Sequence, residues 1–216
     1  MDRKERYRQV IGYFQENMPV AETELVYSNA YQLAVAVILS AQCTDKRVNQ
    51  ITPWFFRKFP TPDILAKANS GEIYELIKSC SYPNNKAKNL QGMARVLVEK
   101  FKGEMPDEIN KLQELPGIGR KSANVILSVI YSKPVMAVDT HVFRVSKRIG
   151  LTWRAKTPLE AEKQLVKYIS GDILHVAHHW LILHGRYICT ARAPKCNECG
   201  MRKFCRYFNN VKSKKV

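Results

Sequence analysis

The sequence predicts an all-α protein, and three observations support this fold class. Apolar residues recur at helical spacing in most segments of the chain. Several segments open on Thr or Asp followed by Pro or Glu, which are residues that start helices. No Asn-Gly or Asp-Gly pair stands between alternating apolar residues, so the usual short signal of a β-hairpin is absent from the sequence.

The apolar periodicity is clearest in three stretches, which contain Val10, Ile11 and Phe14, then Leu33, Val37 and Ile38, then Leu90, Met93, Ala94, Leu97 and Phe101. Helix starts are predicted at Thr44-Asp45, Thr61-Pro62-Asp63, Thr157-Pro158-Leu159-Glu160 and Gly171-Asp172. Pro53 lies inside the helical run from Asp45 to Phe59 and is expected to kink or end that helix. The charged tail, residues 211–216, is expected to fray.

Charge is the unusual feature of the composition. The 216 residues suffice for one large domain or two small ones, and 35 Lys and Arg against 19 Asp and Glu give a net charge of +16. This balance favours a nucleic-acid partner, although a merely solubilising surface or an anionic membrane would also suit it. The longest apolar stretch, Leu33 to Ala41, is far short of the ~20 residues that span a bilayer. With no signal peptide visible either, we expect a cytoplasmic protein.

A glycine-rich loop lies between two helical segments, in Leu115-Pro-Gly-Ile-Gly-Arg-Lys-Ser-Ala123. Pro116 is expected to stop the incoming helix, and Gly117 and Gly119 are expected to adopt backbone angles closed to other residues. The following helix, residues 119–131, would then point its first N–H groups and positive dipole end at an anion. An ordinary helix–turn–helix corner is the alternative, and the adjacent Arg120 and Lys121 favour a phosphate site.

Four of the six cysteines, Cys189, Cys196, Cys199 and Cys205, are close together near the C-terminus. Four thiolates within 17 residues predict a metal site, and both zinc and iron–sulfur clusters accept four cysteines. Cys43 and Cys80 fall outside this pattern and are expected to be buried free thiols. The histidines at 175, 178, 179 and 184 share one amphipathic helix, residues 173–186, and we expect packing from them instead of a second metal site.

These motifs resemble the helix-hairpin-helix base-excision DNA glycosylases, most closely the endonuclease III-like enzymes. The resemblance rests on Ser40-Ala-Gln-Cys-Thr-Asp45, on the loop at 115–123, on Val138-Asp-Thr-His-Val-Phe-Arg-Val145 and on the cysteine spacing. It implies a six-helix barrel at residues 23–133 and a helical iron–sulfur domain formed by residues 1–22 with 134–216. DNA would lie across the cleft between the two domains. The resemblance also selects a [4Fe–4S] cluster over zinc for the four cysteines.

The resemblance assigns two catalytic residues. Lys121 corresponds to the family's nucleophile, and Asp139 to its second catalytic residue, which would shuttle protons or stabilise positive charge on the sugar. An amine attacks only when unprotonated, and the helix dipole and burial would both favour that form of Lys121. Without the resemblance, Lys121 would be a phosphate contact and Asp139 a helix N-cap.

The remaining expected DNA contacts also follow from the resemblance. Gln42 and Tyr82 would fill the gap left by the flipped nucleotide, although Ser81-Tyr82-Pro83 departs from the Gly-Leu-Tyr common in the family. Tyr82 could instead be an ordinary surface-turn residue, and Lys86 and Lys88 are expected to contact phosphates or to face solvent. His141 is either a DNA-backbone contact or a packing residue. The hairpin residues Gly117, Gly119 and Arg120, and Lys195 in the cysteine loop, complete the expected DNA-binding set.

The resemblance therefore implies a monomeric base-excision repair enzyme in the cytoplasm, associated with the nucleoid. It would excise oxidised pyrimidines from double-stranded DNA through Lys121 and then cut the strand as an AP lyase. One alternative is a glycosylase of the same fold that acts on mismatched thymine or on pyrimidine dimers. Another is an iron–sulfur DNA-binding protein without catalytic activity.

Overall fold

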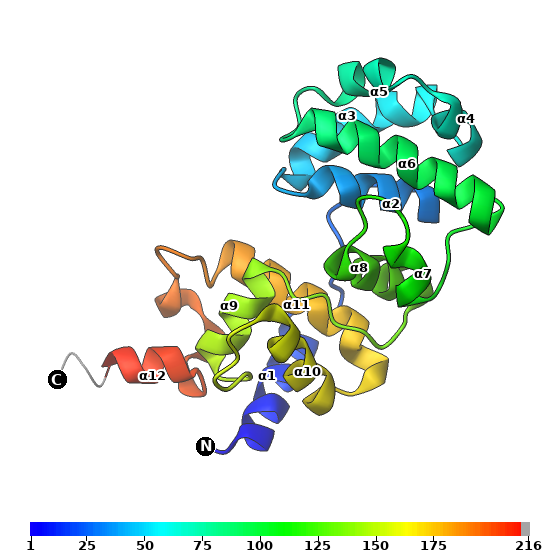
Figure 1. Cartoon of the computed structure of the whole chain (residues 1–216). Helices are drawn as coiled ribbons and strands as arrows, with labels where there is room; N and C mark the ends of the chain where they lie inside the picture. The colour runs from blue at the N-terminus through cyan, green and yellow to red at the C-terminus, as the bar shows by residue number, and fades with distance from the viewer. Residues whose placement is uncertain (213–216) are drawn as a thin grey trace. The chain divides into compact units, whose positions relative to one another are not determined.

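The structure is a computed structural model that describes residues 1–212, with side chains up to Asn210, so the expected fraying of the tail falls largely outside it. All regular elements in residues 1–212 are helices and none is a strand, which confirms the predicted all-α class (Figure 1). The chain divides into two compact units. We call Thr23–Tyr131 the central unit, and Met1–Glu22 together with the chain from Ser132 onward the terminal unit.

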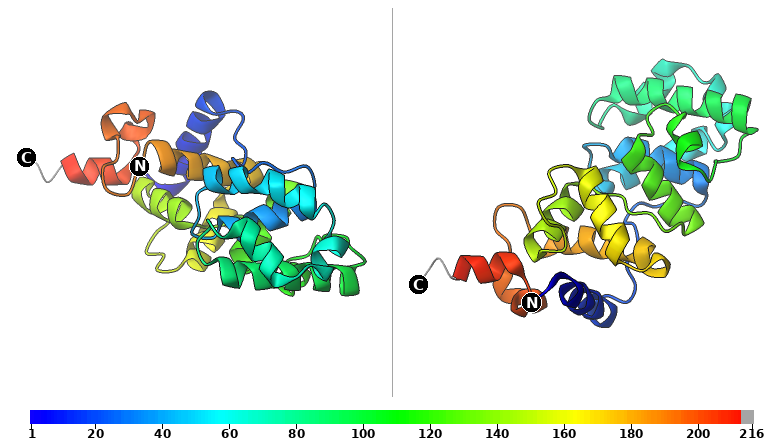
Figure 2. Two further views of the ribbon diagram at one scale, coloured as in Figure 1. Left: turned by 90° about the horizontal axis from the view of Figure 1, so that it is seen from above. Right: turned by 60° about the horizontal axis from the view of Figure 1, so that its bottom comes forward.

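The central unit is assembled around a helix that is apolar on all sides, α2 (Ala30–Ser40), whose residues from Leu33 to Leu39 are all buried. Helices α3, α6 and α8 contact α2, and α4 and α5 pack on α6 (Figures 1 and 2). The other helices of this unit are α3 (Asp45–Lys58), α4 (Pro62–Lys67), α5 (Ser70–Ile77), α6 (Pro83–Phe101), α7 (Ile109–Gln113) and α8 (Arg120–Tyr131).

Three of the predicted helix starts are confirmed by capping hydrogen bonds. The hydroxyls of Thr44, Thr61 and Thr157 each accept a hydrogen bond from the backbone N–H three residues later, at 3.2–3.4 Å. Pro53 was expected to kink or end its helix, and the helix does not end there, because α3 continues to Lys58. Pro53 is exposed, so water can solvate the carbonyl that it leaves without a donor, and buried Ile51 and Phe55 anchor the helix on both sides of it.

The terminal unit joins the two ends of the chain in one hydrophobic core. Phe14 of α1 (Arg3–Asn17) stacks on Trp180 of α11 (Leu174–Tyr187) with ring centroids 5.5 Å apart. The Trp180 indole N–H also donates to the Met18 carbonyl at 2.7 Å. The remaining helices of this unit are α9 (Thr140–Ile149), α10 (Pro158–Tyr168), η1 (Gly171–Ile173), η2 (Cys196–Glu198), η3 (Gly200–Lys203) and α12 (Arg206–Lys212).

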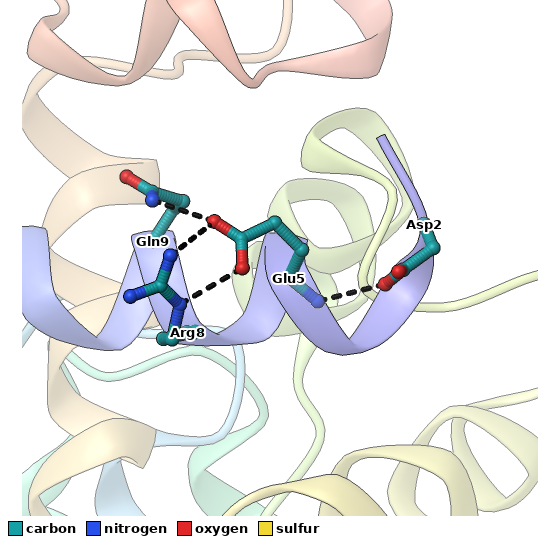
Figure 3. Close-up of polar contacts among 4 residues, drawn as sticks. All are labelled: Asp2, Glu5, Arg8 and Gln9. Atoms are coloured by element: carbon teal, nitrogen blue, oxygen red, sulfur yellow. Dashed lines mark hydrogen bonds and ion pairs between the residues drawn. The ribbon is translucent and has the colours of Figure 1, made fainter.

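Polar contacts fix the first turn of α1 (Figure 3). The Asp2 carboxylate accepts a hydrogen bond from the Glu5 backbone N–H at 2.8 Å, which caps the helix. Hydrogen bonds donated by Arg8 and Gln9 lower the pKa of the Glu5 carboxyl to about 2, and those from Arg8 have the larger effect. Glu5 is therefore ionised near the positive end of the helix dipole, where a carboxylate is favourable.

None of the helices in residues 1–212 combines the length and the apolar character that a bilayer crossing requires.

Candidate active site and cysteine cluster

The glycine-rich loop joins α7 to α8 and rests on α6. Gly117 has a φ of +84°, and a Cβ there would lie 3.0 Å from the Asn89 side chain. Pro116 packs on Gly92, where a Cβ would lie 3.1 Å from the proline ring. The expectation of a special backbone angle is confirmed for Gly117 and wrong for Gly119, which lies outside the left-handed region and has open space around it. The loop therefore presents backbone to solvent at the start of α8.

Because of this difference, alanine is expected to destabilise the protein at Gly117 but not at Gly119. Gly117→Ala is expected to lower the free energy of unfolding by about 1–3 kcal/mol, because the new methyl group meets both a left-handed φ and Asn89. Gly119→Ala is the matched control and should change it by less than about 0.5 kcal/mol. Urea unfolding of the three proteins measures both values. Equal stability of the two variants would contradict this account of the loop.

Lys121 lies in the first turn of α8, and its side chain is exposed. The helix is anchored by its opposite face, where Ala123, Ile126 and Leu127 are buried. The expectation that burial would help to neutralise Lys121 is wrong for this structure, because the side chain faces solvent. The position at the positive end of the helix dipole, the other expected cause, is present.

Asp139 belongs to the terminal unit and is the N-cap of α9. Its carboxylate accepts a hydrogen bond from the Val142 backbone N–H at 2.7 Å, and buried Val138 and Val142 flank it. The residue as a whole is half-buried. The structure thus supports the capping role directly.

Gln42 and Tyr82, the two residues expected to fill the gap in DNA, lie on two loops that are bonded to each other. The Ser81 hydroxyl donates to the Gln42 carbonyl at 2.6 Å. Both residues have left-handed backbones, with φ of 54° at Gln42 and 56° at Tyr82, and both side chains are exposed. A left-handed φ is uncommon in residues other than glycine and is often associated with function.

The expectation for Lys86 is wrong, whereas Lys88 is exposed as expected. The Lys86 ammonium is buried and donates to the carbonyls of Leu39 and Ala41, both at 2.7 Å. These carbonyls lie at the C-terminal end of α2, where a cation is favourable. Through these two hydrogen bonds Lys86 anchors the backbone that directly precedes Gln42. No local sequence pattern indicates this role, because it depends on a contact between α2 and α6.

Two arginines of α9 hold the chain around the first cluster cysteine. Arg144 donates to the Gly185 carbonyl at 2.8 Å and to the Cys189 carbonyl at 3.1 Å. Arg148 donates to the Thr190 carbonyl at 2.6 Å and lies 3.6 Å from the Cys189 sulfur. Sequence reasoning missed both residues. Their i, i+4 spacing was the available signal, with Arg144 inside the segment at 138–145 and Arg148 three residues after it.

His141, between Asp139 and these arginines, packs closely on α11. Its Nδ1 lies 3.2 Å from Arg144, and a Cβ on Gly185 would come 2.9 Å from the His141 Cβ. The side chain is half-buried, so packing accounts for much of its surface. Arg120 and Lys195, the other expected DNA contacts, are exposed on α8 and in the cysteine loop.

All four C-terminal cysteines line one small cavity in the terminal unit. His184 is buried beside them with its Nε2 3.7 Å from the Cys199 sulfur, and burial lowers its pKa to about 4, so its ring is neutral. Gly200 leaves room for Tyr13 of α1, because a Cβ at this position would clash with the tyrosine ring. Burial raises the pKa of the Cys199 and Cys205 thiols, which therefore need a positive partner to become thiolates.

The four cysteines that line this cavity offer four sulfur ligands in one place. Four cysteine thiolates are a ligand set that both a zinc ion and a [4Fe–4S] cluster accept. The cavity lining therefore fits a metal group held by four cysteines.

Comparison with known proteins identifies the family. Residues 35–170 match the model of the HhH-GPD superfamily, described as base excision DNA repair proteins. The chain is 45% identical to endonuclease III of Rickettsia prowazekii (strain Madrid E), over 94% of this chain and 95% of that protein. It is 38% identical to endonuclease III of Escherichia coli (strain K12), over 96% of this chain and 98% of that protein.

Solved structures agree with these sequence matches. A trapped endonuclease III–DNA covalent intermediate (estranged-adenine complex) superposes with a TM-score of 0.93 at 40% identity, covering 98% of this chain and 100% of the other. A thermostable thymine-DNA glycosylase has a TM-score of 0.82 at 23% identity, covering 96% and 97%, and so shares the fold alone. The hairpin around Gly117 and the cysteine-lined cavity thus occur in a chain whose relatives align along nearly its whole length, and this protein belongs to the endonuclease III family within the HhH-GPD superfamily of base excision DNA repair proteins.

Proposed function

We propose that this protein excises oxidised pyrimidines from double-stranded DNA with Lys121 as the nucleophile. The class of activity, base-excision repair by a DNA glycosylase and AP lyase, follows from the family. The assignment of Lys121 as the nucleophile rests on one observation: its side chain is exposed in the first turn of α8, directly after the Gly117 loop. Backbone N–H groups at that helix start would hold a DNA phosphate beside the amine.

In the proposed reaction, the neutral Lys121 amine attacks the sugar C1′ and the damaged base leaves with the glycosidic electron pair. The resulting hemiaminal loses a proton from nitrogen, and its C1′–O4′ bond then breaks while O4′ takes up a proton, which gives a protonated imine between Lys121 and the opened sugar. The imine acidifies C2′, and loss of that proton expels the 3′ phosphate and cuts the strand. The similar endonuclease III structure that was trapped as a covalent DNA intermediate supports this route.

Asp139 would act on the charge that develops during attack. A carboxylate stabilises positive charge on the sugar ring and can carry protons between Lys121 and the leaving base. A carboxylate close to Lys121 would also stabilise the protonated amine, which opposes nucleophilic attack. We therefore assign Asp139 mainly to the transition state and to proton transfer, with its orientation fixed by the Val142 hydrogen bond.

Gln42 and Tyr82 would occupy the space left when the damaged nucleotide turns out of the duplex. The hydrogen bond between Ser81 and Gln42 supports this, because it keeps the two exposed side chains on joined loops. Tyr82 offers an aromatic face for stacking, which is worth ~1–3 kcal/mol per base. We place this activity in the cytoplasm at the nucleoid, with the protein acting as a monomer.

Trapping of the imine by reduction with borohydride tests the proposal. The protein is incubated with duplexes that each carry one defined lesion: an abasic site, an oxidised pyrimidine, a G·T mismatch or a pyrimidine dimer. We expect covalent protein–DNA adducts with the abasic site and with the oxidised pyrimidine. Adducts with the mismatch or the dimer alone would reassign the lesion, and the absence of any adduct would favour a DNA-binding protein without catalytic activity.

We also propose that Cys189, Cys196, Cys199 and Cys205 hold a [4Fe–4S] cluster, which would fix the fold of a basic loop that contains Lys195. Anaerobically purified protein is expected to be brown and to contain about four irons per chain. Removal of the iron by a chelator should lower the thermal midpoint, because ligand binding and folding are coupled. A colourless preparation with one zinc per chain would contradict the assignment.

A further inference from the structure

The two cysteines outside the cluster, Cys43 and Cys80, are neighbours in the central unit. Cys43 follows the C-terminal end of α2, and Cys80 follows α5. The two thiols are close enough for Cys43 to help raise the pKa of Cys80. The Ser81–Gln42 hydrogen bond of 2.6 Å joins the adjacent residues of the same two loops, so the two backbones are held together at this point. Neither cysteine has a role in the proposed repair reaction.

The two thiols differ in exposure. Cys80 is only 4% exposed, whereas Cys43 is half-buried and therefore the more accessible residue of the two. Burial is the main cause that raises the pKa of the Cys80 thiol to about 11, and the neighbouring Cys43 adds to it. The positive charges of Lys86 and Arg47 lower this pKa in part. Buried Lys86 therefore places a cation beside the pair, and a cation stabilises a thiolate when one forms.

We propose that Cys43 and Cys80 are a redox modification site that forms a reversible disulfide in response to peroxide. Cys43, as thiolate, attacks one oxygen of hydrogen peroxide; the O–O bond breaks, and a sulfenic acid and water result after protonation. The Cys80 sulfur then attacks the Cys43 sulfur, the S–O bond breaks, and a second water leaves. Two thiols lose two electrons and two protons, and peroxide is reduced to two water molecules.

The disulfide would fix the separation of the loops that carry Gln42 and Tyr82. Each loop contains a residue with a left-handed backbone close to the cysteine pair, Gln42 in one loop and Tyr82 in the other. Such conformations persist only where surrounding contacts hold them, and contacts between the two loops serve this purpose. A covalent bond would replace the weak thiol contact while the Ser81–Gln42 bond remains. Any consequence for DNA binding rests on the proposed function, whereas formation of the disulfide does not.

The test uses the holoenzyme with about two equivalents of hydrogen peroxide. Free thiols are alkylated, and proteolytic peptides are then analysed by mass spectrometry. We expect the peptides of Cys43 and Cys80 to appear linked, about 2 Da lighter than their sum, and to separate on addition of dithiothreitol. The linked protein should melt at least about 4 °C above the reduced protein, because the bond closes a long loop.

Two variants distinguish the order of attack. In Cys80→Ala, peroxide should leave a sulfenic acid on Cys43 that dimedone traps, and the rise in Tm should disappear. In Cys43→Ser, the buried Cys80 should remain an unmodified thiol. The inference is overturned if both thiols of the wild type stay free, or if Cys80 is oxidised as fast in Cys43→Ser. Because the readout is the mass of peptides, failure of the strand-cleavage assay would leave this result unaffected.

Discussion

Lys121→Gln is expected to abolish both the borohydride-trapped adduct and strand cleavage at abasic sites, with a loss of at least about 10³-fold in the single-turnover rate. The amide of glutamine cannot form an imine, so the covalent route is closed. Duplex binding should persist, because the Gly117 loop and the backbone of α8 remain. The substitution is on an exposed face, so the thermal midpoint should change by less than about 2 °C.

Lys67→Gln is the matched control for this experiment. Lys67 is an exposed lysine of α4 in the same unit, and it has no proposed part in the site. It removes the same charge, so a general loss of DNA attraction would affect both variants equally. A Lys121→Gln protein that cleaves abasic duplex at the wild-type rate would refute the assignment of the nucleophile.

Substitutions of Asp139 are expected to separate its capping role from its chemical role. Asparagine also caps helices, so Asp139→Asn should keep the hydrogen bond to Val142 and leave stability nearly unchanged. It removes the negative charge, however, and should slow base excision by about 10²-fold or more. Asp139→Ala removes both roles and should also lose about 1 kcal/mol of stability.

Thr157→Ala supplies the corresponding stability control. Thr157 caps α10 in the same terminal unit, where its hydroxyl accepts from the Glu160 N–H at 3.2 Å. This variant should lose a similar stability but keep full excision activity. If Asp139→Asn excises the base as fast as the wild type, Asp139 is a helix cap alone.

Both experiments depend on local features that were readable in the sequence. The capping threonines, the start of α9 at Thr140 and the left-handed Gly117 all follow from residues within one helical turn of each other. The cysteine spacing likewise predicted a common site, and the four side chains do line one cavity. Such features are decided by short stretches of backbone, where steric limits and neighbouring hydrogen bonds dominate.

Other expectations failed because packing between distant segments decided the outcome. Lys86 was expected at the surface, but it is buried and donates hydrogen bonds to the carbonyls at the end of α2. Pro53 was expected to kink or end its helix, yet α3 continues past it to Lys58, with buried neighbours on both sides. Gly119 was expected to need a special φ, and the turn is made by Gly117 alone.

The sequence by itself determined the helical class, most of the helix starts and the grouping of four cysteines, because each depends on residues near one another in the chain. Only the tertiary structure brought Tyr13 against Gly200, the α9 arginines against the Cys189 loop, and Cys43 against Cys80. These contacts join residues far apart in sequence. They form when apolar helix faces are buried against each other, and no local pattern specifies which faces will meet.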